Sequence, residues 1–294
     1  MVRYSAVKAI LNKLVRRFQE AYILSLRPKE ISAMIRVKDE EEYLYVAVKS
    51  IIDQVEEAVI IENLSTDNTP AVVKSLCREF PSKVVCYKYP HEIRRIGRDN
   101  WELATKPFSR FSRHLLANYY NWSLRKCTRS YILKWDGDMI ALDTFCHSLA
   151  EFRRSERQVM WFKGANVHPD LKHLIAPINS DLESFQSSLV APTTLSNWMS
   201  AYTDCEPRLF PRAFARYNTA FWWCERLQSP FLDGEDKSCY ALKVEDVCYL
   251  HMKYCKRNPY ANFSDDFKRV IFSNIGRGDP INVELIETLS RWTS

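Results

Sequence analysis

The order of apolar and polar positions divides the first half of the chain into alternating helices and strands. Residues 5–26 place apolar side chains at helical spacing with Lys and Arg between them, and Pro28 ends this amphipathic helix. A β-prone run at 31–37 follows, then a helix that reaches about Gln54, and then a second β-prone run at 57–61. Strand, helix and strand within about thirty residues predict a right-handed βαβ unit.

The same periodicities continue to the end of the chain. They predict helices at 70–79, 110–125, 144–153 and 283–289, strands at 84–89, within 131–140 and at 161–164, an irregular stretch at 168–205, and a late strand that ends at His251. Strands that alternate with helices are typical of an α/β fold. We therefore expect a mostly parallel sheet flanked by helices in a single domain.

Composition supports a folded protein and narrows the ligands only slightly. With 294 residues, 46% of them apolar, the chain can bury a sizeable core as one globular unit or two closely fused lobes. The net charge of +6 suits an anionic ligand such as a nucleotide diphosphate, but it suits a membrane surface or nucleic acid equally well. Charge alone therefore does not choose the partner.

Cysteine usage and apolar runs bear on the compartment. The nine cysteines form no C-x-x-C pair and no metal-finger spacing, so we interpret them as reduced thiols in a cytosolic protein, and a zinc site is disfavoured. No apolar run approaches the roughly 18 residues of a transmembrane helix, and no signal-peptide pattern is present. We expect a cytoplasmic protein that is soluble or peripherally associated with a membrane.

The basic amphipathic helix at 5–26 has two interpretations. Its apolar stripe could lie on an anionic bilayer, with the interleaved Lys and Arg side chains at the headgroups. More commonly, such a stripe packs on the body of the protein. The sequence favours packing and leaves peripheral membrane contact as the alternative.

The run YILKWDGDMI at 131–140 carries the strongest candidate chemistry. An apolar strand stops there at two carboxylates, Asp136 and Asp138, which are separated by Gly137. Residues two apart in a strand share a face, so both acids can reach one cation, and glycine lets the backbone turn between them. Hard oxygen ligands suit Mg²⁺ or Mn²⁺ that carries a substrate diphosphate. The alternative is an ordinary Asp-Gly turn with two solvated acids.

Two earlier segments join this one in a recognisable order. Residues 35–44 read IRVKDEEEYL, residues 60–69 read IIENLSTDNT, and both precede Asp136-Gly137-Asp138. Over about residues 30–145 the trio resembles the GT-A glycosyltransferases, closest to glycosyltransferase family 2. In that family the first strand ends in a P-x-x-N-E-E-like loop, the second in D-D-G-S-T-D-N-T, and a later strand in the metal-binding D-x-D. Here Glu62-Asn63 stands in place of two Asp, and Leu64 in place of Gly.

The resemblance implies a GT-A, Rossmann-like fold with a nucleotide-sugar half and an acceptor half. It implies transfer of a sugar from a nucleotide-diphospho sugar to a hydroxyl group of a glycan or other acceptor, with inversion, and with Mn²⁺ or Mg²⁺ as cofactor. The implied metal ligands are Asp136, Asp138 and His251, although a structural histidine is an equal reading of the last. The implied nucleotide-sugar contacts are Val37, Asp39, Glu41, Glu62, Asn118, Lys134, Asp136, Gly137 and Lys253.

The catalytic base is implied by a later segment. Residues 231–236 read FLDGED, which resembles the G-x-E-D element that supplies the base in inverting GT-A enzymes. The candidates are Asp236, Glu235 and Asp233, and Glu225 also stays open.

Two further clusters have a structural and a functional interpretation each. Arg94, Arg95 and Arg98 are either a solvated basic loop, which we favour, or a clamp for a diphosphate. Residues 221–223 (FWW) are either core or a platform for a sugar ring.

The sequence also predicts how the chain is divided and which rival functions remain. We expect an N-terminal helix at 1–29, a nucleotide-sugar half at 30–150, a half that carries the acceptor site and base at 151–260, and a tail at 261–294. No nucleic-acid partner is expected. One rival is a nucleotidyltransferase, although the acids at 39–42 and only six glycines fit poorly with its Gly-rich triphosphate loop. The other rival is a catalytically silent module that binds glycan or membrane.

Overall fold

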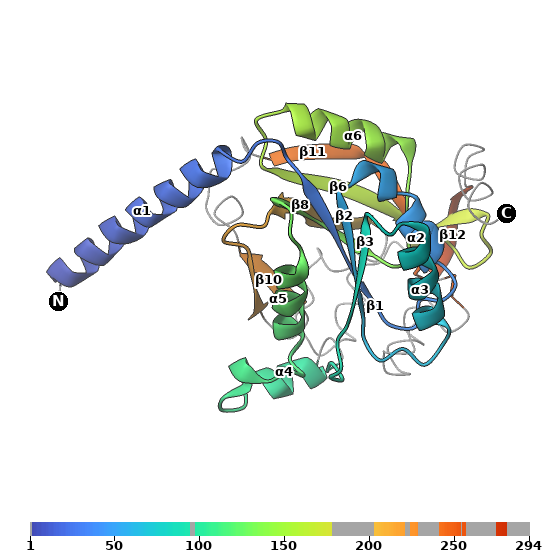
Figure 1. Cartoon of the computed structure of the whole chain (residues 1–294), viewed down its shortest axis with the longest axis horizontal. Coiled ribbons are helices and arrows are strands. Elements are labelled where there is room, and N and C mark those ends of the chain that lie inside the picture. Colours follow the sequence, from blue (N-terminus) through green and yellow to red (C-terminus); the bar gives the residue numbers. More distant parts are fainter. Residues whose placement is uncertain are drawn as a thin grey trace.

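A mixed eight-stranded sheet flanked by helices forms the centre of the protein (Figure 1). The computed structural model describes residues 2–94, 98–177, 203–220, 224–228, 241–253, 255–256 and 275–280. Within them the strands of the main sheet follow the order β3-β2-β1-β4-β8-β6-β11-β5. The predicted α/β class is confirmed.

The first half of the sheet is entirely parallel. Strands β3 (Val84–Lys88), β2 (Glu57–Glu62), β1 (Ile31–Val37) and β4 (Tyr131–Asp136) pair side by side in that order. Helix α2 (Leu44–Lys49) and the 3₁₀ turn Ile52–Gln54 connect β1 to β2, and α3 (Thr69–Glu79) connects β2 to β3. The βαβ unit is confirmed, with a helix that is shorter than predicted.

Helices cover both faces of this parallel half, so its inner strands β1 and β2 are buried along nearly their whole length, whereas β3 at the edge is partly exposed. Alternate residues of β1 enter different clusters, as the two-residue period of a strand requires. Ile35 packs with side chains of α2, α3 and α6 (Asp143–Arg154). Met34 packs on the other face with side chains of α5 (Leu116–Lys126).

The second half of the sheet mixes directions. Strand β8 (Thr203–Pro211) is antiparallel to both β4 and β6 (Val159–Asn166). Strand β11 (Ala241–His251) is parallel to β6, and the short β5 (Met139–Ala141) is antiparallel to β11. The late strand that ends at His251 is therefore confirmed.

Two small ribbons lie outside the main sheet. Strand β7 (His173–Pro177) pairs with β12 (Ile275–Pro280), and β9 (Arg216–Ala220) pairs with β10 (Cys224–Gln228). The prediction that 168–205 is irregular is wrong for β7 and for the first residues of β8. The partner strand of β7 lies about a hundred residues away, and no local pattern signals such a pairing. The helical pattern at 283–289 lies outside the described residues.

The segment between β3 and α5 is more ordered than the sequence suggests. It contains α4 (Arg98–Ala104) and the 3₁₀ turn Ser109–Phe111, and α5 begins only after this turn, at Leu116. Of the basic cluster considered above, Arg94 lies before this helix and is exposed, and Arg98 is its first residue. Arg95 lies outside the described residues.

Helix α1 (Val2–Leu24) projects from the sheet (Figure 1). Between residues 11 and 18 its apolar side chains are exposed, with Leu14 at 56% and Phe18 at 69%. Further along, Tyr22 packs edge-on against Phe214, and Ile23 is the one residue of the helix among the described side chains that reaches the core. The prediction that this stripe packs on the body is therefore wrong for residues 11–18. No helix among the described residues combines the length and the apolar character needed to cross a membrane.

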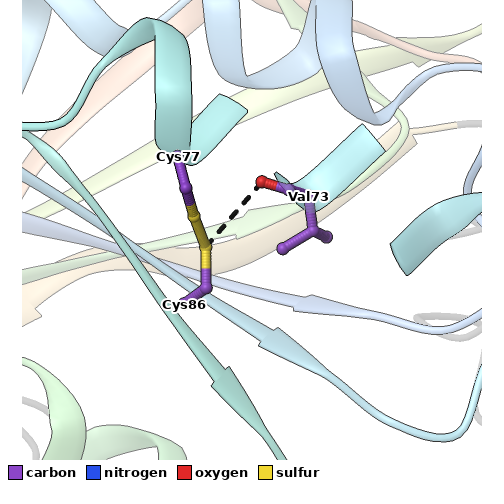
Figure 2. The surroundings of a disulfide bond; sticks show 3 residues. All are labelled: Val73, Cys77 and Cys86. Atoms are coloured by element: carbon purple, nitrogen blue, oxygen red, sulfur yellow. Dashed lines mark hydrogen bonds between the residues drawn. A yellow bond between two sulfur atoms is a disulfide. The ribbon is translucent and has the colours of Figure 1, made fainter. Parts of the chain in front are cut away.

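A disulfide joins the end of α3 to β3 (Figure 2). It links Cys77 and Cys86, and the sulfur of Cys86 lies 3.9 Å from the carbonyl oxygen of Val73. The interpretation of all nine cysteines as reduced thiols is thereby corrected. The sequence does not signal this bond, because the two cysteines stand nine residues apart and meet only when the helix packs on the strand. Among the described residues Cys127, Cys146, Cys248 and Cys255 are free thiols.

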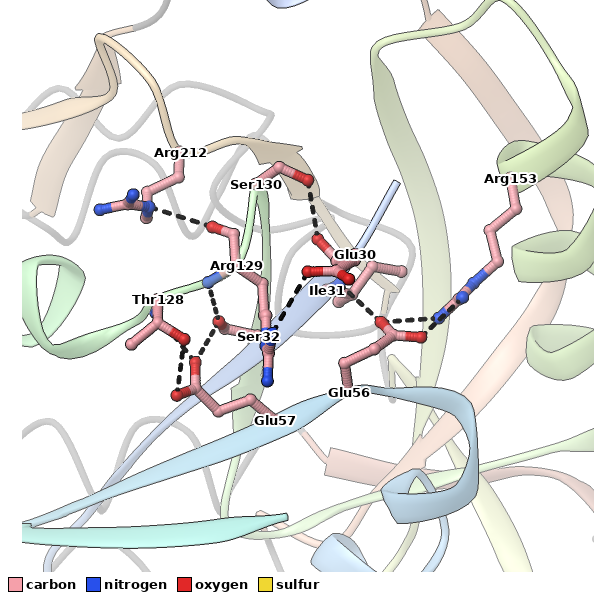
Figure 3. Close-up of polar contacts among 10 residues, drawn as sticks. All are labelled: Glu30, Ile31, Ser32, Glu56, Glu57, Thr128, Arg129, Ser130, Arg153 and Arg212. Atoms are coloured by element: carbon pink, nitrogen blue, oxygen red, sulfur yellow. Dashed lines mark hydrogen bonds and ion pairs between the residues drawn. The ribbon is translucent and has the colours of Figure 1, made fainter. Parts of the chain in front are cut away.

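Polar side chains gather where the parallel strands begin (Figure 3). The carboxylate of Glu57 accepts hydrogen bonds from the Ser32 hydroxyl and from the backbone N–H of Thr128 at 2.9 Å. Beside it, Glu56 pairs with Arg153 at 2.8 Å. These contacts tie β1, β2, α6 and the start of β4 together.

Candidate functional site

The three strands that carry the sequence motifs end at one level of the sheet. In the register of β1 with its neighbours, Arg36 stands opposite Asp136 and Val37 stands opposite Glu62. The carboxyl ends of parallel strands form the edge at which α/β proteins usually bind ligands. The predicted meeting of the three motifs at one edge is therefore observed.

Hydrogen bonds in both directions connect the loops after β1 and β2. The Asp39 carboxylate accepts the N–H of Thr66 at 2.6 Å, and the Glu41 carboxylate accepts the N–H of Asn68 at 2.9 Å. In return, Ser65, Asp67 and Thr69 side chains accept the backbone N–H groups of residues 39–41. Asp39 and Glu41, which were predicted to contact the nucleotide sugar, thus brace the two loops in this structure.

Both loops contain a residue in the left-handed backbone region. Asp39 has φ 56° and Leu64 has φ 51°. Asp tolerates this region, whereas Leu does not favour it and Gly does. The resembled family carries Gly at the position of Leu64. Leu64 therefore adopts a backbone conformation that favours glycine. Strained residues of this kind concentrate at functional sites.

The end of β2 faces the same space with buried polar groups. Glu62 is 6% exposed and its carboxylate accepts the N–H of Ser65 at 2.6 Å. The Asn63 amide donates to the carbonyl oxygens of Tyr89 and His91, at 3.0 and 2.8 Å. The loop after β2 is thereby fixed to the segment after β3.

Residues 136–138 form a tight turn between β4 and β5 rather than an extended strand end. A Cβ atom at Gly137 would lie 3.0 Å from Cγ1 of Val37 and 3.2 Å from Cγ of Glu40, so the loop after β1 lies directly against this glycine. The same-face argument for Asp136 and Asp138 holds only within a strand, and the turn sends the two carboxylates to different partners.

Asp136 is the last residue of β4 and lies on the face that α5 covers. Its carboxylate lies 3.9 Å from the Arg36 guanidinium, which in turn stacks on the Tyr120 ring with Cζ 3.3 Å from the ring centroid. Arg36 is largely buried, with 9% of its side chain exposed. A fixed positive charge therefore stands beside Asp136.

Asp138 lies on the other side of the turn, in a buried charge cluster. Its Oδ1 is 3.2 Å from His251 Nε2, and its Oδ2 is 2.6 Å from Lys256 Nζ. The same ammonium group is 2.7 Å from Glu40 Oε1. One lysine thus bridges two carboxylates from the loops after β1 and β4.

The surroundings shift the pKa values of the two acids of this cluster in opposite directions. Burial raises the pKa of Glu40 to about 8, assisted by the charge of Asp138. Burial acts the same way on Asp138, but Lys256 and His251 outweigh it and hold the pKa of Asp138 well below its usual range. The Oε2 atom of Glu40 is buried without a hydrogen-bond partner among the described residues. The cluster therefore holds a buried positive charge between two carboxylates, and one carboxylate oxygen in it has no partner among the described residues.

Sequence reasoning missed two members of this cluster, Glu40 and Lys256. They are 216 positions apart. Glu40 stood in the acidic loop without an assigned role, and Lys256 was assigned none. No sequence signal pairs them, because the contact depends on where β11 delivers the residues that follow it.

The donor set fits a divalent metal in kind. Carboxylate oxygens are the ligands that Mg²⁺ and Mn²⁺ prefer, and the ammonium of Lys256 already occupies a cation position between two of them. Among the described residues, however, no group of three or more His, Cys, Asp or Glu side chains is arranged to hold a metal. Asp138 and His251 are brought together and Asp136 turns to Arg36, so the three-ligand set stays a prediction.

The remaining predicted contacts come from different elements. Asn118 lies in α5, and its amide donates to the carbonyl oxygens of Arg110 and Ser112. Lys134 lies two residues before Asp136 in β4, and Lys253 follows β11. The base candidates Asp233, Glu235 and Asp236 lie outside the described residues, as does the 221–223 aromatic run. Glu225 lies in β10.

Comparison with known proteins points to one class. Residues 17–144 match the model of a family described as beta-1,4-N-acetylgalactosaminyltransferase (CgtA). Over this segment, which is less than half of the chain, the match confirms the resemblance to glycosyltransferases. No curated protein matches the chain in sequence.

Two solved structures are among those to which the chain is similar. One is TarS of S. aureus, residues 1–349 in complex with UDP, with 11% identity, 76% of this chain and 60% of that chain covered, and a TM-score of 0.41. The other is glucosyl-3-phosphoglycerate synthase from Mycobacterium tuberculosis with Mn²⁺, UDP and phosphoglyceric acid, with 16% identity, 48% and 43% covered, and a TM-score of 0.29. The chain spans less than two thirds of the length of either structure.

Proposed function

We propose that the chain is a glycosyltransferase that moves a sugar from a nucleotide-diphospho sugar to a hydroxyl group of a glycan or other acceptor. The observation that carries the proposal is the register of β1, β2 and β4, which brings the three motif-bearing loops to one sheet edge. The family match over residues 17–144 supports the same reaction class. A nucleotidyltransferase would need a glycine-rich triphosphate loop after β1, where this chain carries braced acids instead.

We further propose that transfer depends on Mn²⁺ or Mg²⁺. Asp136 and Asp138 would hold the metal, with His251 as a third ligand. When bound, the metal would neutralise negative charge on the departing nucleotide diphosphate. The chain itself contributes Arg36, whose stacking on Tyr120 keeps a second positive charge at this edge. Glu62 and the end of β1 at Val37 would face the nucleoside.

The acceptor side needs a base, and we propose an acid of residues 233–236 for that role. The base takes the proton of the acceptor hydroxyl, the oxygen forms a bond to the anomeric carbon, and the nucleoside diphosphate leaves with the bonding electron pair. A single displacement of this kind inverts the anomeric centre. The variants Asp233→Asn, Glu235→Gln and Asp236→Asn should separate the candidates, since only the base variant loses turnover while it retains donor binding.

The exposed stripe of α1 supports peripheral membrane contact. Lys13, Arg16 and Arg17 flank apolar side chains that nothing covers in the described structure. Such a helix binds anionic bilayers through apolar burial and charge together. Co-sedimentation with phosphatidylserine vesicles should therefore fall in a Leu14→Asp, Phe18→Asp variant, and equal sedimentation of the two forms would remove the membrane contact.

The decisive experiment is incubation of the full chain with a panel of UDP-, GDP- and CMP-sugars, with and without Mn²⁺. UDP-N-acetylgalactosamine is the first donor to try, because the matched family is named for transfer of that sugar. Metal-dependent release of free nucleotide with a glycosylated product supports the proposal. Donor binding without turnover would instead indicate a silent binding module, and release of pyrophosphate from nucleoside triphosphates would indicate a nucleotidyltransferase.

A further inference from the structure

A cavity of about 720 Å³ lies along α5, beside the acidic edge. Helix α5 forms one wall, the segment after β3 forms another, and the turn before α5 and the start of β9 complete it. The side chains that decide its chemistry are Arg110, Arg113, Arg125, Arg216, Tyr89 and Trp122. None of the residues that carry the acidic cluster lines this cavity.

The charged groups of the lining are all positive. It contains four guanidinium groups and no carboxylate. Arg113 lies 3.3 Å from the ring of His91, and Arg110 lies over the Phe111 ring at 4.7 Å. Within the described parts of the chain, none of the four arginines forms an ion pair with an acid. Guanidinium groups bind phosphate and carboxylate with two parallel hydrogen bonds, so such a cluster suits an anion.

The cavity also offers aromatic surface. Trp122 packs edge-on against Tyr89 with the ring centroids 5.0 Å apart, and Phe111 is 69% exposed at the wall. Ligand sites typically combine such apolar and aromatic walls with a few polar groups. An inorganic ion alone would leave this surface unused, whereas a ligand with a ring and an anionic group would use both parts.

The wall of the cavity continues into the candidate active site. Asn63, at the end of β2, donates to the backbone of Tyr89 and His91. On the other side, Asn121 exchanges hydrogen bonds with the backbone of Tyr217, whose ring packs against Tyr120. Tyr120 carries the Arg36 guanidinium that faces Asp136. A ligand in the cavity would therefore lie one layer of side chains from the donor edge.

We propose that this cavity binds an anionic saccharide, with its phosphate or carboxylate group held by the arginines and its ring against Trp122 and Phe111. In the glycosyl-transfer reaction this ligand would be the acceptor, a role that rests on the proposed function. The binding itself does not rest on it and can be measured without donor or metal.

Isothermal titration of the full chain tests the proposal. The probes are glucose 6-phosphate, glucuronate, glucose and inorganic phosphate, and one or both of the charged sugars should bind at least about tenfold more tightly than glucose. Comparison of glucose 6-phosphate with glucuronate shows whether the cavity prefers a phosphate or a carboxylate group. Affinity should fall about tenfold or more in an Arg113→Gln, Arg125→Gln variant and stay unchanged in Arg78→Gln, which removes an exposed arginine of α3 outside the cavity.

Three outcomes would overturn the proposal. Equal affinity for glucose would remove the role of the arginines, and equal affinity for inorganic phosphate would remove the saccharide. Displacement of the bound sugar by UDP would make the cavity part of the nucleotide site. None of these results depends on turnover, so failure of the transferase assay would leave the binding result intact, and the reverse also holds.

Discussion

The two ends of the same parallel strands differ in how their acidic side chains are paired. Where the strands begin, the acids have dedicated partners, as the buried Glu57 has in Ser32 and Thr128, and the half-buried Glu56 in Arg153 (Figure 3). Where they end, a single ammonium from Lys256 serves two carboxylates, and one oxygen of Glu40 is left without a partner among the described residues.

The backbone differs in the same way. The beginning of the sheet is closed by regular strand pairing and side chains that bond to it, with no left-handed residue among the network members of Figure 3. The end of the sheet is made of loops with left-handed backbone at Asp39 and Leu64. Satisfied polar networks rigidify a fold, and a buried carboxylate oxygen without a partner is an atom that a ligand can complete. Within the described part of the chain, the unpartnered buried atom at the beginning of the sheet is Arg129 Nε, and at the end it is a carboxylate oxygen of Glu40. This difference between the carboxylates agrees with the proposal that the end of the sheet acts and its beginning is structural.

The largest effect expected from this comparison is on turnover. Asp138→Asn keeps the size of the side chain but removes the charge that faces Lys256 and His251, and turnover should fall by about 10²–10³-fold, as when a group that stabilises developing charge is lost. Steady-state transfer assays measure this. Asp53→Asn, at an exposed acid near the other end of the strands, is the matched control and should have normal turnover.

Normal turnover in the Asp138 variant would assign the chemistry elsewhere, provided that circular dichroism shows the variant folded. The same assay in the presence of a chelator separates a metal role from a purely structural one. Loss of activity on chelation in the parent chain is expected to be reversed by added Mn²⁺.

The second effect is on stability without metal. In Lys256→Met the carboxylates of Glu40 and Asp138 keep their burial but lose their shared cation, which should cost about 3 kcal/mol, as for breaking a buried ion pair. A divalent cation that binds the folded state would recover part of this loss. The melting temperature of the variant should therefore rise more on addition of Mn²⁺ than that of the parent chain.

Lys74→Met is the control for this measurement, because Lys74 is exposed on α3. It should leave both the melting temperature and its response to Mn²⁺ unchanged. An equal response to Mn²⁺ in the parent and in Lys256→Met would show that the lysine and the metal do not share a site.

The third effect tests the structural end of the sheet. Glu57→Gln replaces a carboxylate that accepts from Ser32 and Thr128 with an amide that can satisfy only some of these donors, so the free energy of unfolding should fall by about 2 kcal/mol. Urea unfolding measures the loss. Turnover per folded molecule should not change, and a drop in turnover without loss of stability would erase the distinction between the two ends.

Local patterns in the sequence predict the parallel half of the fold and the acids at its edge. Apolar runs with strand periodicity define β1, β2 and β4, and parallel pairing then brings the loops after them together. What the sequence does not predict depends on long-range placement. The Cys77–Cys86 bond requires α3 to lie on β3, and the Lys256 contact with Glu40 requires the end of β11 to reach the loop after β1.

The same limit explains the turn at Asp136-Gly137-Asp138. Two acids one residue apart share a face only if the strand continues, and here β5 begins at Met139 to pair with β11. The partner of β5, the antiparallel strand β11, lies over a hundred residues further along the chain. The sequence therefore predicts the acids and their edge, while their separate partners follow from the second half of the sheet.

The smallest effect concerns pH at the structural end. Burial acts to raise the pKa of Glu56, but hydrogen bonds from Arg153 and from the N–H of Ile31 outweigh it and hold the pKa below its usual value. The stabilisation from this depressed pKa is complete above the unfolded-state value of about 4.3 and is lost as the pH falls through the folded-state value. Because the pair is about one-third exposed, its worth is below about 1 kcal/mol. Urea unfolding of the parent and of Glu56→Gln should differ by that amount at pH 7 and converge below about pH 4, whereas a constant difference across this range would show that Glu56 acts through packing rather than through its charge.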